Sequence, residues 1–561
     1  MITRRFFLGA ALLCLAQAAS AAPLDDGFQN PPDSARPQMW WHWMNGNVTK
    51  EGITADLESM KRVGIGGATI VNADCGIPHG PVNFMSPEWR EDVKFAVSEA
   101  NRLGLELCIE NCGGWSSSGG PWNVVSNSMQ QVSTSELRIT GPKHFSDVLP
   151  QPPTQLGFYR DIAVLAFRTP EGEAVDMKTL VSKATTSAKG QDNNTKFYDG
   201  SDDTFVTLPA PKPDHPQFVQ LEFAQPFLVR SITLTLGPSA RDWFMGDCGG
   251  VIQASDDGVN FRDLCKFSFP SDRALSPLNF TLADSPASAH FFRALFTRAG
   301  THVKQIPVAE FQISPRLSLE NLAAKAGFNG NAVASAEENG AIAPTLVVPR
   351  ADTFDLTDRL KPDGRLDWNV PAGDWTILRI GYTPTGVKNG TAPPEGMGLE
   401  CDKFSKEALD AHWAGMMKPV LDDVGPLAGK SLTGSLIDSY EVGGQNWTPK
   451  FRAEFQKRRG YDPLLFLPAF TGRVVDNPAV TERFLWDVRR TIADLFAENY
   501  YGHFQSLCHQ AGLIAYNEPY TGPFESLQAG GGCRHSDGRI LGGSTVGHRQ
   551  AAGKCWSHLR A

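Results

Sequence analysis

The fold of this chain is decided by the stretch Gly434-Ser-Leu-Ile-Asp-Ser-Tyr-Glu-Val-Gly-Gly-Gln-Asn-Trp-Thr-Pro449. Its apolar run Ser435–Ile437 predicts a short buried strand, after which Asp438 and Glu441 lie in a loop that contains two glycines. Thr448-Pro449 then favours a helix start, with proline at the first helical position. A strand, a polar loop and a helix form a β/α unit. In a (β/α)8 barrel the catalytic side chains come from the carboxyl ends of the strands.

The loop of this unit carries side chains that suit work on a sugar. Glu441 can act as an acid or a base, while Tyr440 and Asn446 can hydrogen-bond hydroxyl groups. Trp447 adds an aromatic face. We therefore predict that Glu441 is catalytic and that Tyr440 and Asn446 contact the substrate. The alternative for Glu441 is a solvated loop carboxylate with no catalytic role.

Similar units flank the centre of the chain, over residues 36–130 and 395–532. Strands are predicted over residues 39–46, 68–71, 105–109 and 513–516, and helices follow the capping residues Thr49, Ser86 and Ser405. The predicted fold is therefore α/β, a (β/α)8 TIM-like barrel that is interrupted by β-sandwich insertions of the jelly-roll type.

The strand ends of these units supply further candidates for the site. The predicted substrate-binding residues are His42, Asn45, Asn111, Trp115 and Glu518, and Glu525 is a further candidate, whose role as a metal ligand is implied by the family resemblance of the motifs that follow. For His42, a hydrogen-bonded core histidine is an equally good interpretation. For Glu518 and Glu525, the alternative is a carboxylate paired with an arginine or with backbone N–H groups.

The centre of the chain has a different period. Val219–Phe223 and Ile232–Leu236 alternate apolar and polar residues, which is typical of half-buried antiparallel strands. Residues 155–315 therefore predict a β-sandwich that resembles the discoidin-like jelly rolls common among carbohydrate-binding modules. Only Trp243 lies inside it, so we favour a structural role over an aromatic sugar platform. A second β region is predicted over residues 316–390.

The start and the composition indicate an exported soluble enzyme. Residues 1–21 resemble a twin-arginine export signal, with Arg4-Arg5, an apolar run over residues 8–15 and the small residues Ala19-Ser20-Ala21. The apolar run is too short to span a membrane. A net charge of −9 argues against nucleic acid as a partner. We expect a periplasmic or secreted protein with no membrane span. The irregularly spaced cysteines predict no disulfide framework.

The last residues, 533–561, do not match the rest of the chain. They carry five Lys or Arg, one acidic residue and three of the twelve histidines, without a helical or strand period. A disordered basic tail would have this composition, and so would a shifted reading frame. We favour the frameshift, because a shift of one nucleotide near Gly532 can restore a segment that contains Gly-Glu-Phe-Trp.

Five long motifs resemble the glycoside hydrolase family 106 α-L-rhamnosidases. They are Met39–Gly46, Glu110–Trp115, Trp368–Arg379, Pro393–Asp402 and Asp438–Thr448. The resemblance extends over most of residues 36–530. It implies an inverting, Ca²⁺-assisted glycosidase that acts on rhamnose-containing oligo- or polysaccharides. The family's general acid then falls on Glu441, while its general base and part of its calcium site lie beyond Gly532.

Two other functions remain compatible with the sequence. If the second carboxylate is missing, the chain is a catalytically inactive carbohydrate-binding protein. The other possibility is a different barrel glycosidase or lyase that uses Glu441 together with Glu518. A glycan-binding assay beside a hydrolysis assay distinguishes an inactive binding protein from an enzyme. The stereochemistry of the product distinguishes a different glycosidase or lyase from an inverting rhamnosidase.

Overall fold

The computed structural model describes residues 27–29, 32, 35–188, 190, 194–237, 247–269, 277–282, 285–329, 342–520, 522–531 and 535–536. The predicted export signal lies outside these residues, as does the tail except for 535–536. Among the described residues, no helix combines the length and apolarity needed to cross a membrane. The seven described cysteines are all free, as the sequence predicts.

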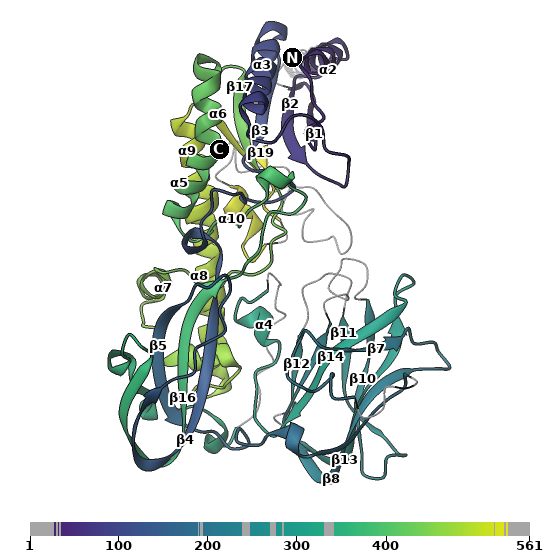
Figure 1. The fold of residues 1–561 in the computed structure, drawn as a ribbon, viewed down its shortest axis with the longest axis vertical. Coiled ribbons are helices and arrows are strands. Elements are labelled where there is room, and N and C mark those ends of the chain that lie inside the picture. The colour runs from purple at the N-terminus through teal and green to yellow at the C-terminus, as the bar shows by residue number, and fades with distance from the viewer. Residues whose placement is uncertain are drawn as a thin grey trace, which may run out of the picture.

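A parallel sheet forms one end of the elongated molecule (Figure 1). Its strands run in the order β1 (Gln38–Met44), β2 (Gly67–Ala73), β3 (Glu106–Glu110), β17 (Leu432–Ile437), β18 (Ile514–Asn517) and β19 (His535–Ser536). Every neighbouring pair is parallel. The α/β class is therefore as predicted, but a closed barrel is not confirmed. Within the described residues the sheet has six strands, with β1 and β19 at its edges.

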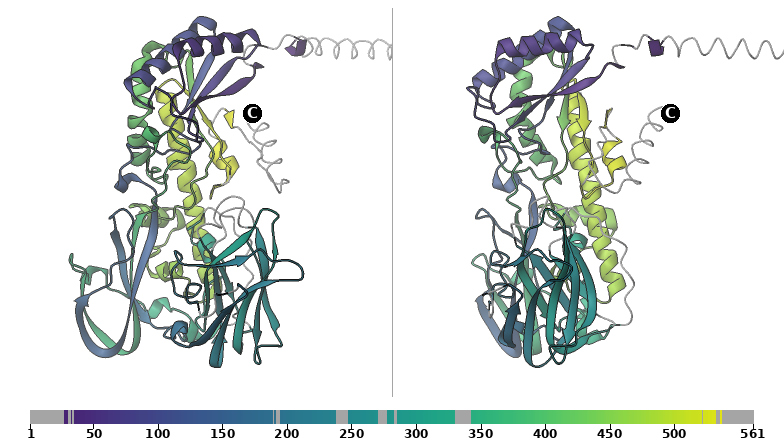
Figure 2. Two further views of the ribbon diagram at one scale, coloured as in Figure 1. Left: turned by 45° about the vertical axis from the view of Figure 1, so that its right-hand side comes forward. Right: turned by 90° about the vertical axis from the view of Figure 1, so that its right-hand side faces the viewer.

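Some of the helices pack against this sheet, and others continue down the molecule (Figure 1). They are α2 (Lys50–Arg62), α3 (Pro87–Leu103), α5 (Lys406–Gly415), α6 (Met417–Val424), α7 (Phe451–Arg459), α8 (Pro478–Leu495), α9 (Gly502–Gln510) and α10 (Ser526–Gly530). Thr49, Ser86 and Ser405 cap α2, α3 and α5 through their side chains, as predicted. A π-helical turn, Phe496–Tyr501, joins α8 to α9 in one long rod (Figure 2).

One helix start differs from the prediction. The helix expected at Thr448-Pro449 begins at Phe451. The Thr448 hydroxyl donates instead to the buried carboxylate of Asp402, over 2.6 Å. A tertiary hydrogen bond therefore replaces the local capping interaction and delays the helix.

Between the third and fourth strands of the parallel sheet, the chain forms a separate four-stranded antiparallel sheet. Its order is β15 (Phe354–Asp355), β5 (Arg160–Arg168), β16 (Arg365–Pro384) and β4 (Gln130–Val148). The long strand β16 pairs with β4 from Arg365 opposite Val148 to Pro384 opposite Gln130. The region predicted as a separate β unit, 316–390, thus shares a sheet with strands that precede the sandwich in the chain.

The sandwich is in turn inserted into this sheet. One of its layers contains β11 (Arg262–Phe269), β10 (Cys248–Ser255), β13 (Ala287–Ala299), β8 (Gln217–Val229) and β6 (Val181–Thr186). The other layer contains β12 (Leu278–Thr281), β9 (Ser231–Leu236), β14 (Gln305–Ser314) and β7 (Val206–Pro209). Both layers contribute to one hydrophobic core, where Leu221 and Phe292 join Leu234 and Phe311.

Candidate active site

Three acidic side chains lie together at the carboxyl ends of adjacent parallel strands. Glu110 is the last residue of β3, Asp438 follows β17 and Glu518 follows β18. All three are at least 96% buried, and Glu110 is completely inaccessible to solvent. The neighbouring β3 residue Ile109 belongs to the helix-covered core. Side chains alternate along a strand, so Glu110 faces the opposite side of the sheet.

Glu110 lacks the partners that a buried carboxylate normally has. No N–H group or hydroxyl group of a described residue donates to either of its oxygens, and its close polar neighbour is the carboxyl group of Asp438. Burial raises its pKa well above the ordinary value, and the nearby carboxyl groups of Asp438 and Glu518 raise it further. A buried negative charge is costly unless it is neutralised or bound. The pocket therefore requires a proton, a cation or a ligand donor at Glu110.

Glu441 lies close to this buried acidic cluster. It follows β17 in the loop that also contains Asp438, and its side chain is exposed. The hydroxyl of Ser439 donates to Oε1 of Glu441 over 2.9 Å. On β18, the Tyr520 hydroxyl donates to Oε2 of Glu518 over 2.7 Å. The site thus combines an accessible carboxyl group with buried ones, which is how two carboxyl groups acquire different roles.

An aromatic group lies on the β1 side of the site. His42 is exposed, so the alternative of a buried core histidine does not hold. The Trp115 ring stands edge-on to His42, with 6.2 Å between ring centroids, and it is 39% exposed. Trp40 stacks on the other side of His42 at 6.1 Å. The structure therefore brings His42 and Trp115 together and adds Trp40, which sequence reasoning did not single out.

Asn45 and Asn111 are both buried at strand ends. The amide of Asn45 donates to the Ile77 carbonyl, and that of Asn111 donates to the Ser118 hydroxyl, each over 2.8 Å. The side-chain carbonyl oxygen of each asparagine has no partner among the described residues. Each residue therefore keeps one acceptor that a hydroxyl group could use.

Tyr440, Asn446 and Glu525 take structural positions instead of joining the site. The Tyr440 hydroxyl donates to the Gly443 carbonyl, and its ring packs edge-on against Phe496. Asn446 is fully buried, and its amide bonds to the backbone at two distant positions, the N–H of Val132 and the carbonyl of Ala326. Glu525 is the N-cap of α10 and accepts from the Gln528 N–H over 2.6 Å.

No preformed metal cluster is present in the described part of the chain, where no three His, Cys, Asp or Glu side chains converge to hold an ion. The predicted ligand Glu525 is occupied as a helix cap. Oxygen donors suited to Ca²⁺ lie at Glu110, Asp438 and Glu518 instead. The sequence prediction did not include Glu110 or Asp438, although Asp438 lies in the same loop as Glu441. The alternation of side chains along β3 places Glu110 on the opposite face from Leu107 and Ile109, and this pattern in the sequence could have identified Glu110.

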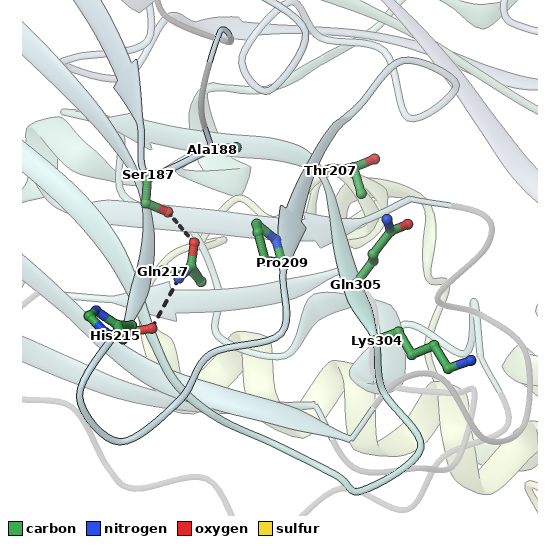
Figure 3. Close-up of a pocket in the computed structure, with 8 residues that line it drawn as sticks. All are labelled: Ser187, Ala188, Thr207, Pro209, His215, Gln217, Lys304 and Gln305. Atoms are coloured by element: carbon green, nitrogen blue, oxygen red, sulfur yellow. Dashed lines mark hydrogen bonds between the residues drawn. The ribbon is translucent and has the colours of Figure 1, made fainter.

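A second hollow lies in the sandwich, far along the molecule from the parallel sheet. This cavity of about 590 Å³ is lined by Ser187, Ala188, Thr207, Pro209, His215, Gln217, Lys304 and Gln305 (Figure 3). Ser187 and the backbone of His215 hold the Gln217 amide in place. None of the lining residues offers a large aromatic face for sugar stacking, which agrees with the structural role favoured for this domain.

Carboxyl groups of unequal burial at the ends of parallel strands define a site for acid–base chemistry. The chain belongs to the alpha-L-rhamnosidase family of glycoside hydrolases, family 106, whose model matches residues 29–531. This confirms the family that the sequence motifs predict.

Two relatives extend the comparison. A solved rhamnosidase from Novosphingobium sp. PP1Y is 32% identical, with a TM-score of 0.76, and the match covers 91% of this chain and 49% of that one. A Formosa agariphila protein named “Putative beta-glucuronidase” is 36% identical over 507 residues, which are 90% of this chain and 31% of that protein. The chain thus spans less than half the length of either relative.

Proposed function

We propose that this chain forms the part of an exported glycoside hydrolase that cleaves α-L-rhamnosides in rhamnose-containing glycans. The observation that carries the proposal is the position of Glu441, which is exposed and lies in the same strand-end loop as a member of the buried acidic cluster, Asp438. Family membership and the similarity to a solved rhamnosidase support the substrate class. The export signal predicted at residues 1–21 supports action outside the cytoplasm.

In this proposal Glu441 is the general acid. A glycosidic bond breaks readily only when its departing oxygen is protonated, and an accessible carboxyl group in this loop can reach the aglycone side. With inversion of configuration, a second carboxylate activates a water molecule on the opposite ring face. The two carboxyl groups of an inverting enzyme stand roughly 6.5–9.5 Å apart to admit that water.

The remaining strand-end residues would hold the sugar. The free acceptors of Asn45 and Asn111 suit donation from ring hydroxyl groups. The exposed rings of His42 and Trp115 suit the apolar C–H face and the methyl group of a 6-deoxy sugar. In this way the site provides both the hydrogen bonds and the apolar contact that rhamnose presents.

We propose that Glu110, Asp438 and Glu518 contribute to binding the Ca²⁺ ion that the family resemblance implies, together with further ligands, because these three described carboxyl groups are not arranged to hold an ion by themselves. The fit rests on the two unpartnered oxygens of Glu110 and on its two acidic neighbours, which are hard oxygen donors. A bound Ca²⁺ would offset two of the three negative charges and attract vicinal hydroxyl groups. Glu525 is not part of this proposed ligand set, because it caps α10.

A β-glucuronidase is the second candidate, and the name of the Formosa agariphila relative favours it. The charges of the pocket favour the neutral sugar. Glu110 is surrounded by the acidic groups Asp438 and Glu518, so a uronate would add a further negative charge to the same pocket. The rhamnoside is therefore the substrate that we propose.

The test compares nitrophenyl α-L-rhamnoside with nitrophenyl β-D-glucuronide and follows the first-formed sugar anomer by ¹H NMR. The proposal expects turnover of the rhamnoside with inverted configuration. Turnover of the glucuronide alone would support the second candidate, and retained configuration would exclude inversion. Calorimetric binding of rhamnose without turnover would identify a carbohydrate-binding protein instead.

A further inference from the structure

Ser439 occupies the centre of a hydrogen-bond network that connects three strand-end loops. It is 3% exposed and follows Asp438 in the loop after β17. Its hydroxyl group donates to Oε1 of Glu441 over 2.9 Å, and the Tyr520 hydroxyl, whose own proton goes to Glu518, lies next to it. Its backbone carbonyl accepts from the Ser117 hydroxyl over 3.3 Å.

The loop after β3, which carries Ser117, is itself fixed by a buried ion pair. Ser116 donates its hydroxyl, and Ser118 its N–H over 3.0 Å, to the carboxylate of Glu400. Lys403 donates to the same carboxylate over 2.6 Å, and both charged side chains are completely buried. The turn that contains Ser117 therefore has little freedom to move.

The loop after β18 supports Ser439 from the other side. Tyr520 is 9% exposed, and its hydroxyl donates to the buried carboxylate of Glu518. Through Tyr520, the Ser439 hydroxyl is linked to an immobile group of the acidic pocket. Glu441, by contrast, is exposed, and among the described residues its side chain accepts a hydrogen bond from Ser439 alone.

We propose that Ser439 is a positioning residue, which holds the carboxyl group of Glu441 in its catalytic orientation while Ser117 and Tyr520 hold Ser439. The inference rests on the proposed role of Glu441 as general acid. An exposed glutamate samples several rotamers, and fixing one of them removes an entropic part of the barrier to proton transfer. Neither the sequence motifs nor the relatives single out Ser439 for this role.

The test uses Ser439→Ala in the full chain, with Ser439→Thr as the conservative variant and Ser435→Ala as the matched control. Ser435 is a fully buried serine on β17, the strand that precedes Ser439, and its hydroxyl contacts the Met417 sulfur on the helix-covered side. Each protein is assayed on an alkyl α-L-rhamnoside, which needs protonation of its leaving group, and on dinitrophenyl α-L-rhamnoside, which needs little.

Ser439→Ala should lower kcat on the alkyl rhamnoside by about 10- to 100-fold, with little change in KM and a smaller loss on the dinitrophenyl substrate. Ser439→Thr should restore most of this activity, and Tyr520→Phe should show a weaker loss with the same substrate dependence. Ser435→Ala should leave both rates unchanged.

An unchanged kcat in Ser439→Ala, or equal losses on both substrates that Ser439→Thr does not restore, would overturn the assignment. Glu441→Gln, measured in parallel, separates this failure from that of the proposed function. If Glu441→Gln loses activity on the alkyl rhamnoside and Ser439→Ala does not, only the positioning role is wrong. If the parent turns over neither substrate, or if Glu441→Gln is fully active, both assignments are wrong.

Discussion

His412 should make the stability of the protein depend on pH. It lies on α5 and is 1% exposed. Its Nε2 donates to the Asn111 carbonyl over 2.8 Å, and its Nδ1 accepts from the Trp122 indole over 2.9 Å. This pattern fits a neutral ring, because a proton on Nδ1 would break the bond from Trp122. Burial lowers the pKa of His412 from 6.5 to about 4.

The magnitude follows from the difference between the two pKa values. The unfolded chain binds a proton at His412 below about pH 6.5, whereas the folded protein does so only near pH 4. Because the pKa is lowered in the folded protein, the contribution of neutral His412 to stability is fully present above pH 6.5 and is lost as the pH falls toward 4. When the pH falls from about 7.5 to about 5, the titration of His412 should lower the free energy of unfolding by about 2 kcal/mol.

Urea unfolding of the parent and of His412→Gln at these two pH values tests this prediction. The Gln side chain can still donate to the Asn111 carbonyl and accept from Trp122, but it does not titrate. Other groups titrate equally in both proteins, so the difference in pH dependence isolates His412. The variant should lose about 2 kcal/mol less than the parent on acidification. Identical losses in the two proteins would refute the reasoning.

Three further predictions concern packing, charge and metal. Lys403→Met should lower the free energy of unfolding in urea by about 3–5 kcal/mol, because it leaves the buried charge of Glu400 without a partner. Adding Glu400→Gln should recover part of that loss, whereas an unchanged stability of the single variant would contradict the prediction. Gly434→Ala should lower the melting temperature because the added Cβ would overlap the Tyr516 ring, and combining it with Tyr516→Ala should relieve that overlap. A melting temperature of Gly434→Ala equal to that of the parent would exclude the clash. Removal of Ca²⁺ by a chelator should lower the hydrolysis rates of activated and unactivated rhamnosides by the same factor. Glu110→Gln should lower the Ca²⁺ affinity measured by calorimetry, and an unaltered affinity would exclude Glu110 as a ligand.

The local elements could be predicted because their signals are local. Side-chain caps such as Thr49 and Ser86 mark helix starts, and apolar runs mark the buried strands. The pairing of β4 with β16 could not be predicted, because the partners Gln130 and Pro384 are separated by the whole inserted sandwich. Closure of an eight-stranded barrel was expected from the type of unit alone, and the described sheet has six strands.

The site was predicted in part for the same reason. Strand ends pointed to Glu441, His42 and Trp115, which lie at the predicted edge of the sheet. Asn446 was misassigned because its partner, the Val132 N–H, lies 314 residues away in the chain. A polar loop residue looks the same in sequence whether it binds a sugar or a distant backbone group. Glu110 was not among the predicted site residues, although the alternation along β3 places it on the other face from Leu107 and Ile109.

The central claim is that Glu441 protonates the leaving group, and the kinetics of Glu441→Gln across rhamnosides of graded leaving-group ability test it most directly. Glu407→Gln, which changes an exposed carboxylate on α5, is the matched control. The account predicts that Glu441→Gln loses about 10²–10⁴-fold in kcat/KM on alkyl rhamnosides and progressively less as the leaving group becomes more acidic. An equal loss across the series, or no loss on the alkyl substrates, would contradict it.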